Sequence, residues 1–247
     1  MSKVYGDAEP TLSVSLTAGS LANVAVSDTL ADVTGTLSRS VGNNVGAYDV
    51  LLGSGAHAFN YDITYNASNQ AFSITPKTVS LSASKVYDGT IDLAGKVTLL
   101  TGVDGETLSY TGALANDAHV ATTGKYIAAI TLANGANGEL ASNYQLPATL
   151  DATTAPVTIS ARTLTATLAN SSVSKVYDGT ANPPAGFTPA WTFDGLLGGD
   201  SAATLTATAA SFNNPNVALA SSFTMSGLAI AGITGSNGSR ASDYVLD

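Results

Sequence analysis

The sequence predicts an all-β chain of three tandem small domains in an elongated array. Three observations predict this class: a short phrase recurs at a domain-sized interval, apolar residues alternate with Thr and Ser, and glycine-containing turn signals separate the alternating runs. An immunoglobulin-like sandwich is the first interpretation for each domain, and a β-grasp-like arrangement is the alternative.

The recurring phrase is centred on a lysine, a valine and a tyrosine. Its copies are Ser2-Lys3-Val4-Tyr5-Gly6-Asp7, Ser84-Lys85-Val86-Tyr87-Asp88-Gly89-Thr90 and Ser174-Lys175-Val176-Tyr177-Asp178-Gly179-Thr180. An acidic landmark follows each copy, at Asp28-Thr29-Leu30, Glu106-Thr107-Leu108 and Asp200-Ser201. A tyrosine landmark ends each repeat, at Asn60-Tyr61, Ser142-Asn143-Tyr144 and Ser242-Asp243-Tyr244. Because the landmarks keep their order, they mark homologous repeats.

The predicted domains are residues 1–76, 77–161 and 162–247. The second and third repeats open with a strand-like run before the phrase, whereas the first begins on the phrase itself. The third repeat has no counterpart of Val157-Thr158-Ile159, the run that closes the second. We therefore expect an excerpt of a longer protein, in which the first domain lacks its first strand and the third lacks its last.

Strands are expected wherever apolar and hydroxyl residues alternate. Residues 78–83 and 163–168 alternate in this way, which is typical of half-buried strands. Further strands are expected at Tyr61–Tyr65, Ala71–Ile74, Lys125–Leu132, Ala155–Ile159, Thr204–Ala209 and Phe223–Ile230.

The phrase has a structural interpretation. An extended phrase places Val86 on the opposite side from Lys85 and Tyr87, and likewise in the other copies. We expect Tyr5, Tyr87 and Tyr177 to bury their rings and to anchor their hydroxyls on backbone groups. Asp88-Gly89 and Asp178-Gly179 predict turns, while the swapped Gly6-Asp7 predicts a different turn. The short polar side chains of Asn60, Asn143 and Asp243 are expected to hold a neighbouring loop.

Composition limits the function classes. The net charge is −9 with only 9 Lys and Arg residues, so the chain offers no concentrated basic face for nucleic acid or anionic membranes. The absence of cysteine excludes disulfides and thiolate metal sites. No apolar run approaches the about 18 residues that cross a bilayer, so membrane insertion is not expected.

Catalytic and metal sites have little support. His57 and His119 occupy non-equivalent places and lack a third ligand. No nucleophile elbow or phosphate-binding loop occurs, so we expect no enzyme and no cofactor. Calcium at Asp7, Asp88 and Asp178 remains an alternative. So does an isopeptide bond that joins Lys3, Lys85 or Lys175 to Asn60, Asn143 or Asp243.

Sugar binding through exposed aromatic rings is a further alternative. Trp191 is the single tryptophan, flanked by Pro189 and Phe193, and Tyr110 is a second candidate. Because large aromatic residues in small β domains usually belong to the core, both are first interpreted as packing residues.

The motifs resemble a known family. Lys-Val-Tyr-Asp-Gly-Thr at residues 85–90 and 175–180 resembles the YDG repeat domains of very large bacterial surface proteins. Lys3-Val4-Tyr5-Gly6-Asp7 and the later run Asn44-Val45-Gly46-Ala47-Tyr48 resemble the sister type, often called MBG. The resemblance covers essentially the whole chain, although the third repeat has an extended middle at residues 182–210.

The resemblance implies strings of such domains in filamentous-haemagglutinin-like secreted adhesins, and no catalytic residues. It leads us to expect a stalk or spacer of an adhesin at the bacterial cell surface or in biofilm matrix, whose partners are other domains of the same protein. The alternative is a module that binds matrix polysaccharide, a cell-surface glycan or a partner protein directly.

Overall fold

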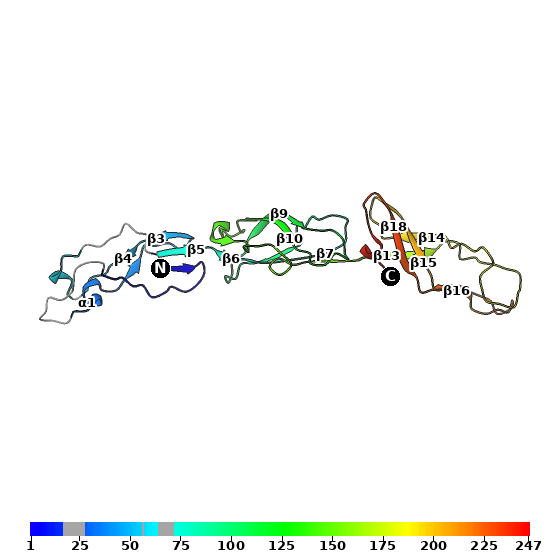
Figure 1. Ribbon diagram of the computed structural model, residues 1–247, viewed down its shortest axis with the longest axis horizontal. Helices are drawn as coiled ribbons and strands as arrows, with labels where there is room; N and C mark the ends of the chain where they lie inside the picture. The colour runs from blue at the N-terminus through cyan, green and yellow to red at the C-terminus, as the bar shows by residue number, and fades with distance from the viewer. Residues whose placement is uncertain (17–27, 56, 64–71) are drawn as a thin grey trace. The chain divides into compact units, whose positions relative to one another are not determined.

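The fold is all-β. The computed structural model describes residues 1–16, 28–55, 57–63 and 72–247, and almost all of its regular elements are short strands (Figure 1). The predicted fold class is therefore confirmed, while the choice between a sandwich and a β-grasp-like arrangement stays a prediction.

The strands of the N-terminal segment form two small sheets. One sheet has the order β1-β5-β3, in which β1 runs parallel to β5, and the other pairs β2 with β4. Buried Val50, Phe72 and Ile74 form the core, against which Tyr5 and Tyr48 pack. The elements are β1 (Ser2–Val4), α1 (Leu30–Thr34), β2 (Ser38–Arg39), β3 (Gly46–Tyr48), β4 (Val50–Leu51), the 3-10 turn η1 (Ala58–Asn60) and β5 (Phe72–Thr75).

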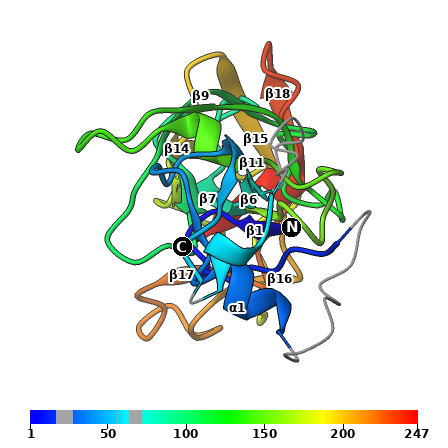
Figure 2. The ribbon, with the colours of Figure 1, turned by 90° about the vertical axis from the view of Figure 1, so that its left-hand side faces the viewer.

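The short helix α1 was not expected from the sequence. Thr29 caps it, because its hydroxyl accepts from the Asp32 N–H while the Asp32 carboxylate accepts from the Thr29 N–H. Gly35 ends the helix at φ +62°, a conformation that favours glycine. The helix is the blue coiled ribbon in Figure 2. A capping box was thus legible at residues 29–32, but the helix is too short to give a periodic pattern.

The middle segment forms the sheets β12-β7-β8, β10-β9 and β11-β6. Strand β7 runs parallel to β12, and the two short strands β6 and β11 are also parallel. The elements are β6 (Lys77–Thr78), β7 (Ser80–Val86), β8 (Val97–Leu100), β9 (Ser109–Ala115), β10 (Ile127–Ala133), the 3-10 turn η2 (Ala141–Asn143), β11 (Tyr144–Gln145) and β12 (Val157–Ser160).

The C-terminal segment forms the sheets β14-β13-β19, β15-β18 and β16-β17. Strand β13 is antiparallel to β14 and parallel to β19, and β15 lies beside β18 in both views (Figures 1 and 2). The elements are β13 (Arg162–Leu168), β14 (Trp191–Asp194), β15 (Asp200–Thr206), β16 (Ala209–Phe212), β17 (Phe223–Ser226), β18 (Ala229–Gly235), the 3-10 turn η3 (Ala241–Asp243) and β19 (Tyr244–Leu246).

The chain packs as two compact units. The first comprises Met1–Ser80, Leu99–Thr111 and Leu132–Thr149, and the second comprises Leu81–Thr98, Gly112–Thr131 and Leu150–Asp247. Both units take residues from the predicted middle domain. The domain boundaries near residues 76 and 161 stay a prediction.

The alternating burial predicted from the sequence is present. In β7 the side chains of Leu81, Ala83 and Lys85 are buried and the intervening ones are exposed. Tyr87 continues the buried face at 1% exposure, whereas Val86 is 53% exposed on the other side. Strand β13 alternates in the same way around buried Leu164.

Three strand predictions need correction. No strand forms at residues 61–63, because the chain leaves η1 there, and residues 64 and 65 lie outside the described residues, as does residue 71 of the strand that became β5. The run 204–209 divides between β15 and β16, and the run 223–230 divides between β17 and β18 at Gly227, whose φ is +60°. A local reversal at these glycine-containing breaks outweighs the strand propensity of the flanking residues.

Candidate functional site

The same tyrosine–carboxylate pair occurs in all three repeats. Each 3-10 turn has the form Ala-x-Asn/Asp and is followed by a tyrosine in extended conformation. The hydroxyl of that tyrosine donates to the acidic landmark of its own repeat. The pairs are Tyr61 with Asp28 at 2.7 Å, Tyr144 with Glu106 at 2.6 Å and Tyr244 with Asp200 at 2.6 Å.

In the first compact unit, the tyrosine of the first phrase completes this pair. The Tyr5 hydroxyl donates to the second oxygen of Glu106 at 2.8 Å, so one carboxylate bridges Tyr5 and Tyr144. The two rings meet edge to face, with centroids 5.3 Å apart and an interplanar angle of 72°. Edge-to-face geometry is a favourable arrangement of aromatic quadrupoles.

In the second compact unit, the tyrosine of the second phrase occupies the corresponding place. The Tyr87 hydroxyl lies 2.9 Å from Ser239 Oγ, which donates to Asp200 at 2.7 Å. The ring of Tyr87 meets Tyr244 edge to face at 5.9 Å and 72°. It also stacks on His119, with centroids 6.2 Å apart.

The residue before each landmark tyrosine supplies a second contact. Asn143 Oδ1 accepts from the Val45 N–H at 2.9 Å, and Asp243 Oδ1 accepts from the Val120 N–H at 2.8 Å. Asn143 also donates to the Asn44 side chain at 2.9 Å. Both side chains hold a neighbouring loop, as the sequence suggested.

Asp243 is the more deeply enclosed of these two residues. It is 0% exposed, and its Oδ2 lies 2.8 Å from His119 Nδ1 and accepts from the Arg240 N–H at 2.8 Å. These bonds compensate for the burial of a carboxylate. We call the two arrangements closed junctions: the first centres on Tyr5, Glu106 and Asn143, the second on Tyr87, Asp200 and Asp243.

Burial sets the protonation of the junction tyrosines. Burial, together with the carboxylate beside each hydroxyl, raises the pKa of Tyr144 far above its usual value and that of Tyr244 to about 12. Burial also raises the pKa of Tyr5 and Tyr87. The phenols are therefore hydrogen-bond donors at neutral pH.

The phrase lysines form a lock within their own loops. Lys85 Nζ lies 2.7 Å from the Asp88 carboxylate and donates to the Thr90 carbonyl at 2.6 Å. Lys175 repeats this at 2.7 Å with Asp178 and 2.8 Å with Thr180. The hydrogen bond from Lys175 lowers the pKa of Asp178 to about 2.

The first phrase forms a different lock, as its swapped residue order predicted. Lys3 Nζ donates to the Asp7 carbonyl at 3.0 Å and to Glu9 at 2.8 Å, while the Asp7 carboxylate pairs with Lys77 at 3.0 Å. In the structure, therefore, the phrase lysines bond within their own loops, and Asn143 and Asp243, two of the proposed isopeptide partners, bond other loops.

The third phrase departs from the expected burial. Tyr177 is 59% exposed and Val176 is 90% exposed, so the prediction that Tyr177 buries its ring is wrong. The prediction of a backbone anchor is also wrong, because the hydroxyls of Tyr5 and Tyr87 bond side chains. In the first repeat, Asn60 is exposed, and His57 Nδ1 lies 2.6 Å from the second oxygen of Asp28.

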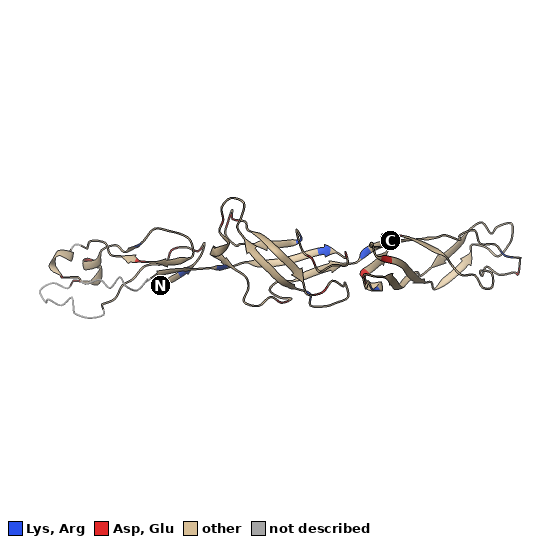
Figure 3. Ribbon diagram, turned by 90° about the horizontal axis from the view of Figure 1, so that it is seen from above, with Lys and Arg blue, Asp and Glu red and all other residues tan. Residues whose placement is uncertain are grey.

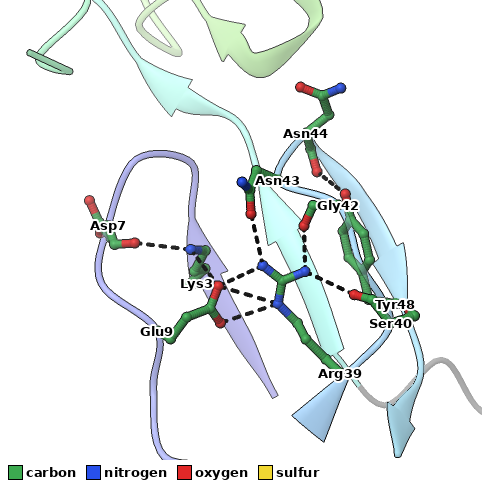
Figure 4. Close-up of polar contacts among 9 residues, drawn as sticks. All are labelled: Lys3, Asp7, Glu9, Arg39, Ser40, Gly42, Asn43, Asn44 and Tyr48. Carbon is green, nitrogen blue, oxygen red and sulfur yellow. Dashed lines mark hydrogen bonds and ion pairs between the residues drawn. The ribbon is translucent and has the colours of Figure 1, made fainter.

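A polar cluster that the sequence did not suggest surrounds Arg39 (Figure 4). Arg39 binds both oxygens of Glu9 and also the carbonyls of Ser40 and Gly42. Its guanidinium lies 4.9 Å from the centre of the Tyr48 ring. The hydrogen bonds from Arg39 and then Lys3 lower the pKa of Glu9 to about 2. A hollow of about 950 Å³ adjoins the cluster, lined by residues 9–14, 30–31 and 34–43.

The sugar-binding candidates are not brought together. Trp191 lies in β14 and Tyr110 in β9, both half-buried, in different compact units. Neither lines the hollow beside Arg39.

The calcium candidates have other partners. Asp7, Asp88 and Asp178 each pair with a lysine. Within the described ranges, no group of three or more His, Asp and Glu side chains is placed to hold a metal ion. Charged residues are sparse along the ribbon (Figure 3), and no helix in the described part is long and apolar enough to span a membrane.

These features define a tandem-repeat β protein whose repeats meet through a tyrosine–carboxylate junction. The profile of the MBG domain (YGX type) matches residues 1–71, and that of the YDG domain matches residues 69–155 and 160–247. The chain belongs to the YDG domain family, with an MBG-type domain at residues 1–71. No curated protein and no solved structure matches the chain significantly.

Proposed function

We propose that the chain is a stalk or spacer segment of a large bacterial adhesin, secreted to the cell surface or the biofilm matrix. Its partners are the other domains of that protein, and it performs no catalytic step. The observation that carries this proposal is the closed junction, which occurs twice with the same parts.

The junctions suit a load-bearing role. One repeat leads into the next with a single intervening residue, since β5 ends at Thr75 and β6 begins at Lys77, and β12 ends at Ser160 and β13 begins at Arg162. A short connection leaves little slack between domains. Two edge-to-face tyrosines and a shared carboxylate then add directional contacts. Such contacts resist rotation more than apolar burial alone, which is non-directional.

The surface chemistry also suits a spacer. The net charge of −9 favours solubility and opposes association between neighbouring stalks. The candidate sugar-binding rings Trp191 and Tyr110 are half-buried and separate, which gives the direct-binding alternative no assembled groove.

The experiment that tests the proposal combines two measurements on the full chain. A glycan array and cell-binding assay, with and without calcium, asks whether the chain retains a ligand. Single-molecule pulling asks whether the chain resists force, and Tyr87→Phe is compared with the matched control Tyr177→Phe. A spacer shows no specific retention and a lower unfolding force only in Tyr87→Phe. Specific retention of one glycan class, lost in Trp191→Ala, would replace the spacer role with direct binding.

A further inference from the structure

The third repeat presents the phrase loop in a preformed but uncovered state. Lys175 holds Asp178 and Thr180 at the distances that Lys85 keeps to Asp88 and Thr90. The Asp178 carboxylate accepts from the Thr180 N–H at 2.9 Å, as Asp88 does from Thr90 at 3.0 Å. The loop is thus ordered by its own bonds, although Tyr177 is 59% exposed against 1% for Tyr87.

The first difference from the covered loops is a missing strand partner. The Tyr5 N–H donates to Thr75 at 2.9 Å and the Tyr87 N–H donates to Ser160 at 2.8 Å, both from the end of a parallel strand. Within the described part of the chain, residues 174–177 pair with no strand. This segment is therefore an open sheet edge.

The second difference is an unused loop contact. His119 and Val120 in the second repeat correspond to Asn216 and Val217 in the third, because the Asp117 side chain accepts from the His119 N–H and the Asn214 side chain accepts from the Asn216 N–H. The Val120 N–H is bound by Asp243. The Val217 N–H has no acceptor among the described residues, and its side chain is 74% exposed.

Residues 174–177, Asn216 and Val217 form what we call the open face. Its parts lie on one end of the repeat, because the Phe212 N–H donates to the Ala181 carbonyl at 2.8 Å and Lys175 Nζ lies 5.8 Å from the Phe212 ring centre. An unpaired strand edge, an exposed aromatic ring and a free N–H together ask for a strand, a carboxylate–tyrosine pair and an Asn or Asp side chain.

We propose that the open face is a docking surface for another domain of the YDG or MBG type, entered through a parallel strand. The two covered loops define the partner's chemistry. Each accepts a strand of the pattern apolar–hydroxyl–Ile–hydroxyl, at Phe72–Thr75 and Val157–Ser160. The next repeat then supplies the carboxylate, the tyrosine and the Asn or Asp residue.

Strand addition to an exposed edge is an established recognition mode, in which main-chain bonds supply affinity and side-chain pockets supply specificity. The proposal rests on the same junction as the spacer function, but it assigns a binding partner that the spacer role alone does not name.

The first test adds a synthetic peptide with the sequence of residues 155–161 to the full chain, at about millimolar concentration because a four-residue strand binds weakly. Hydrogen exchange is followed over residues 173–178. We expect the Val176 and Tyr177 amides to exchange at least about tenfold more slowly with saturating peptide. A scrambled peptide is the control. Equal exchange with both peptides would overturn the proposal.

The second test places a further copy of residues 155–247 after Asp247 and measures nitration of Tyr177 by mass spectrometry. We expect nitration to slow at least about tenfold, toward the rate of Tyr87 in the same sample. The matched control replaces the added copy's counterparts of Asp200 and Tyr244 with Ala, which should restore the rate. Unchanged nitration in a folded extended chain would refute the proposal; if the added copy does not fold, the peptide experiment decides.

Failure here is distinguishable from failure of the spacer function. Retention of a glycan would remove the spacer role without changing the reactivity of Tyr177. An unprotected Tyr177 would remove the docking surface and leave the mechanical comparison at Tyr87 in place.

Discussion

Replacing the same tyrosine in two copies of the phrase should have very different effects. Tyr87 is 1% exposed and packs against Tyr244 and His119, whereas Tyr177 is 59% exposed. Truncation of a buried aromatic side chain to Ala costs about 3–5 kcal/mol of unfolding free energy, through lost burial and the cavity left behind. Truncation of an exposed one stays within about 1 kcal/mol.

The hydroxyl of Tyr87 can be separated from its ring. Tyr87→Phe keeps the ring but removes the bond to Ser239, which still donates to Asp200. The expected loss is about 0.5–1.5 kcal/mol, the usual net value of one hydrogen bond.

The assay is urea unfolding of Tyr87→Ala, Tyr87→Phe and Tyr177→Ala, followed by circular dichroism. Because a chain of several domains need not unfold in one step, hydrogen exchange assigns each loss to its segment. We expect the loss in Tyr87→Ala to appear in η3, β19 and the loop around His119. Losses of similar size in Tyr87→Ala and Tyr177→Ala would refute the reasoning, since they would show that the loop and not the junction sets stability.

Three further predictions concern the charged and titrating groups. Glu106→Gln should cost about 1–3 kcal/mol, because one amide oxygen cannot replace two charge-assisted bonds; denaturation of the isosteric variant checks this, and an unchanged midpoint would contradict it. Because the folded state raises the pKa of Tyr244 to about 12, its contribution is complete below pH about 10 and is lost as the pH rises through about 12, on the order of 2 kcal/mol; a pH series should show this loss reduced in Tyr244→Phe. The pKa of Glu9 is lowered to about 2, so its pairing with Arg39 stabilises above pH about 4.5 and is lost toward pH 2; exchange near residues 39–43 should rise over that range in the native chain but not in Glu9→Gln.

Much of the fold could be predicted because it depends on local periodicity. The alternation at residues 78–83 indicated which side of β7 is buried, and the structure places Leu81 and Ala83 there. The phrase likewise indicated that Val86 faces away from Lys85 and Tyr87, which their exposures confirm. Side-chain direction in a strand has a period of two whatever the strand packs against, so sequence alone is sufficient for such features.

The pairing of landmarks could not be predicted in this way. The acidic landmarks and the landmark tyrosines were both visible as repeats, but nothing local joins Glu106 to Tyr5, which lies 101 residues away, or Tyr87 to Ser239, which lies 152 residues away. Ser239 itself belongs to no repeated motif. Contacts at such separations are set by the closure of the sheets, so they become visible only in the folded chain.

The sequence by itself determined that the chain is a β protein of homologous repeats, because repeated residues and alternation are properties of the chain order. Only the tertiary structure decided what each repeated residue does. Tyr5, Tyr87 and Tyr177 occupy the same place in the same phrase, yet Tyr87 is enclosed and Tyr177 is exposed. Burial depends on whether another segment arrives to cover the ring, and that segment lies outside the phrase.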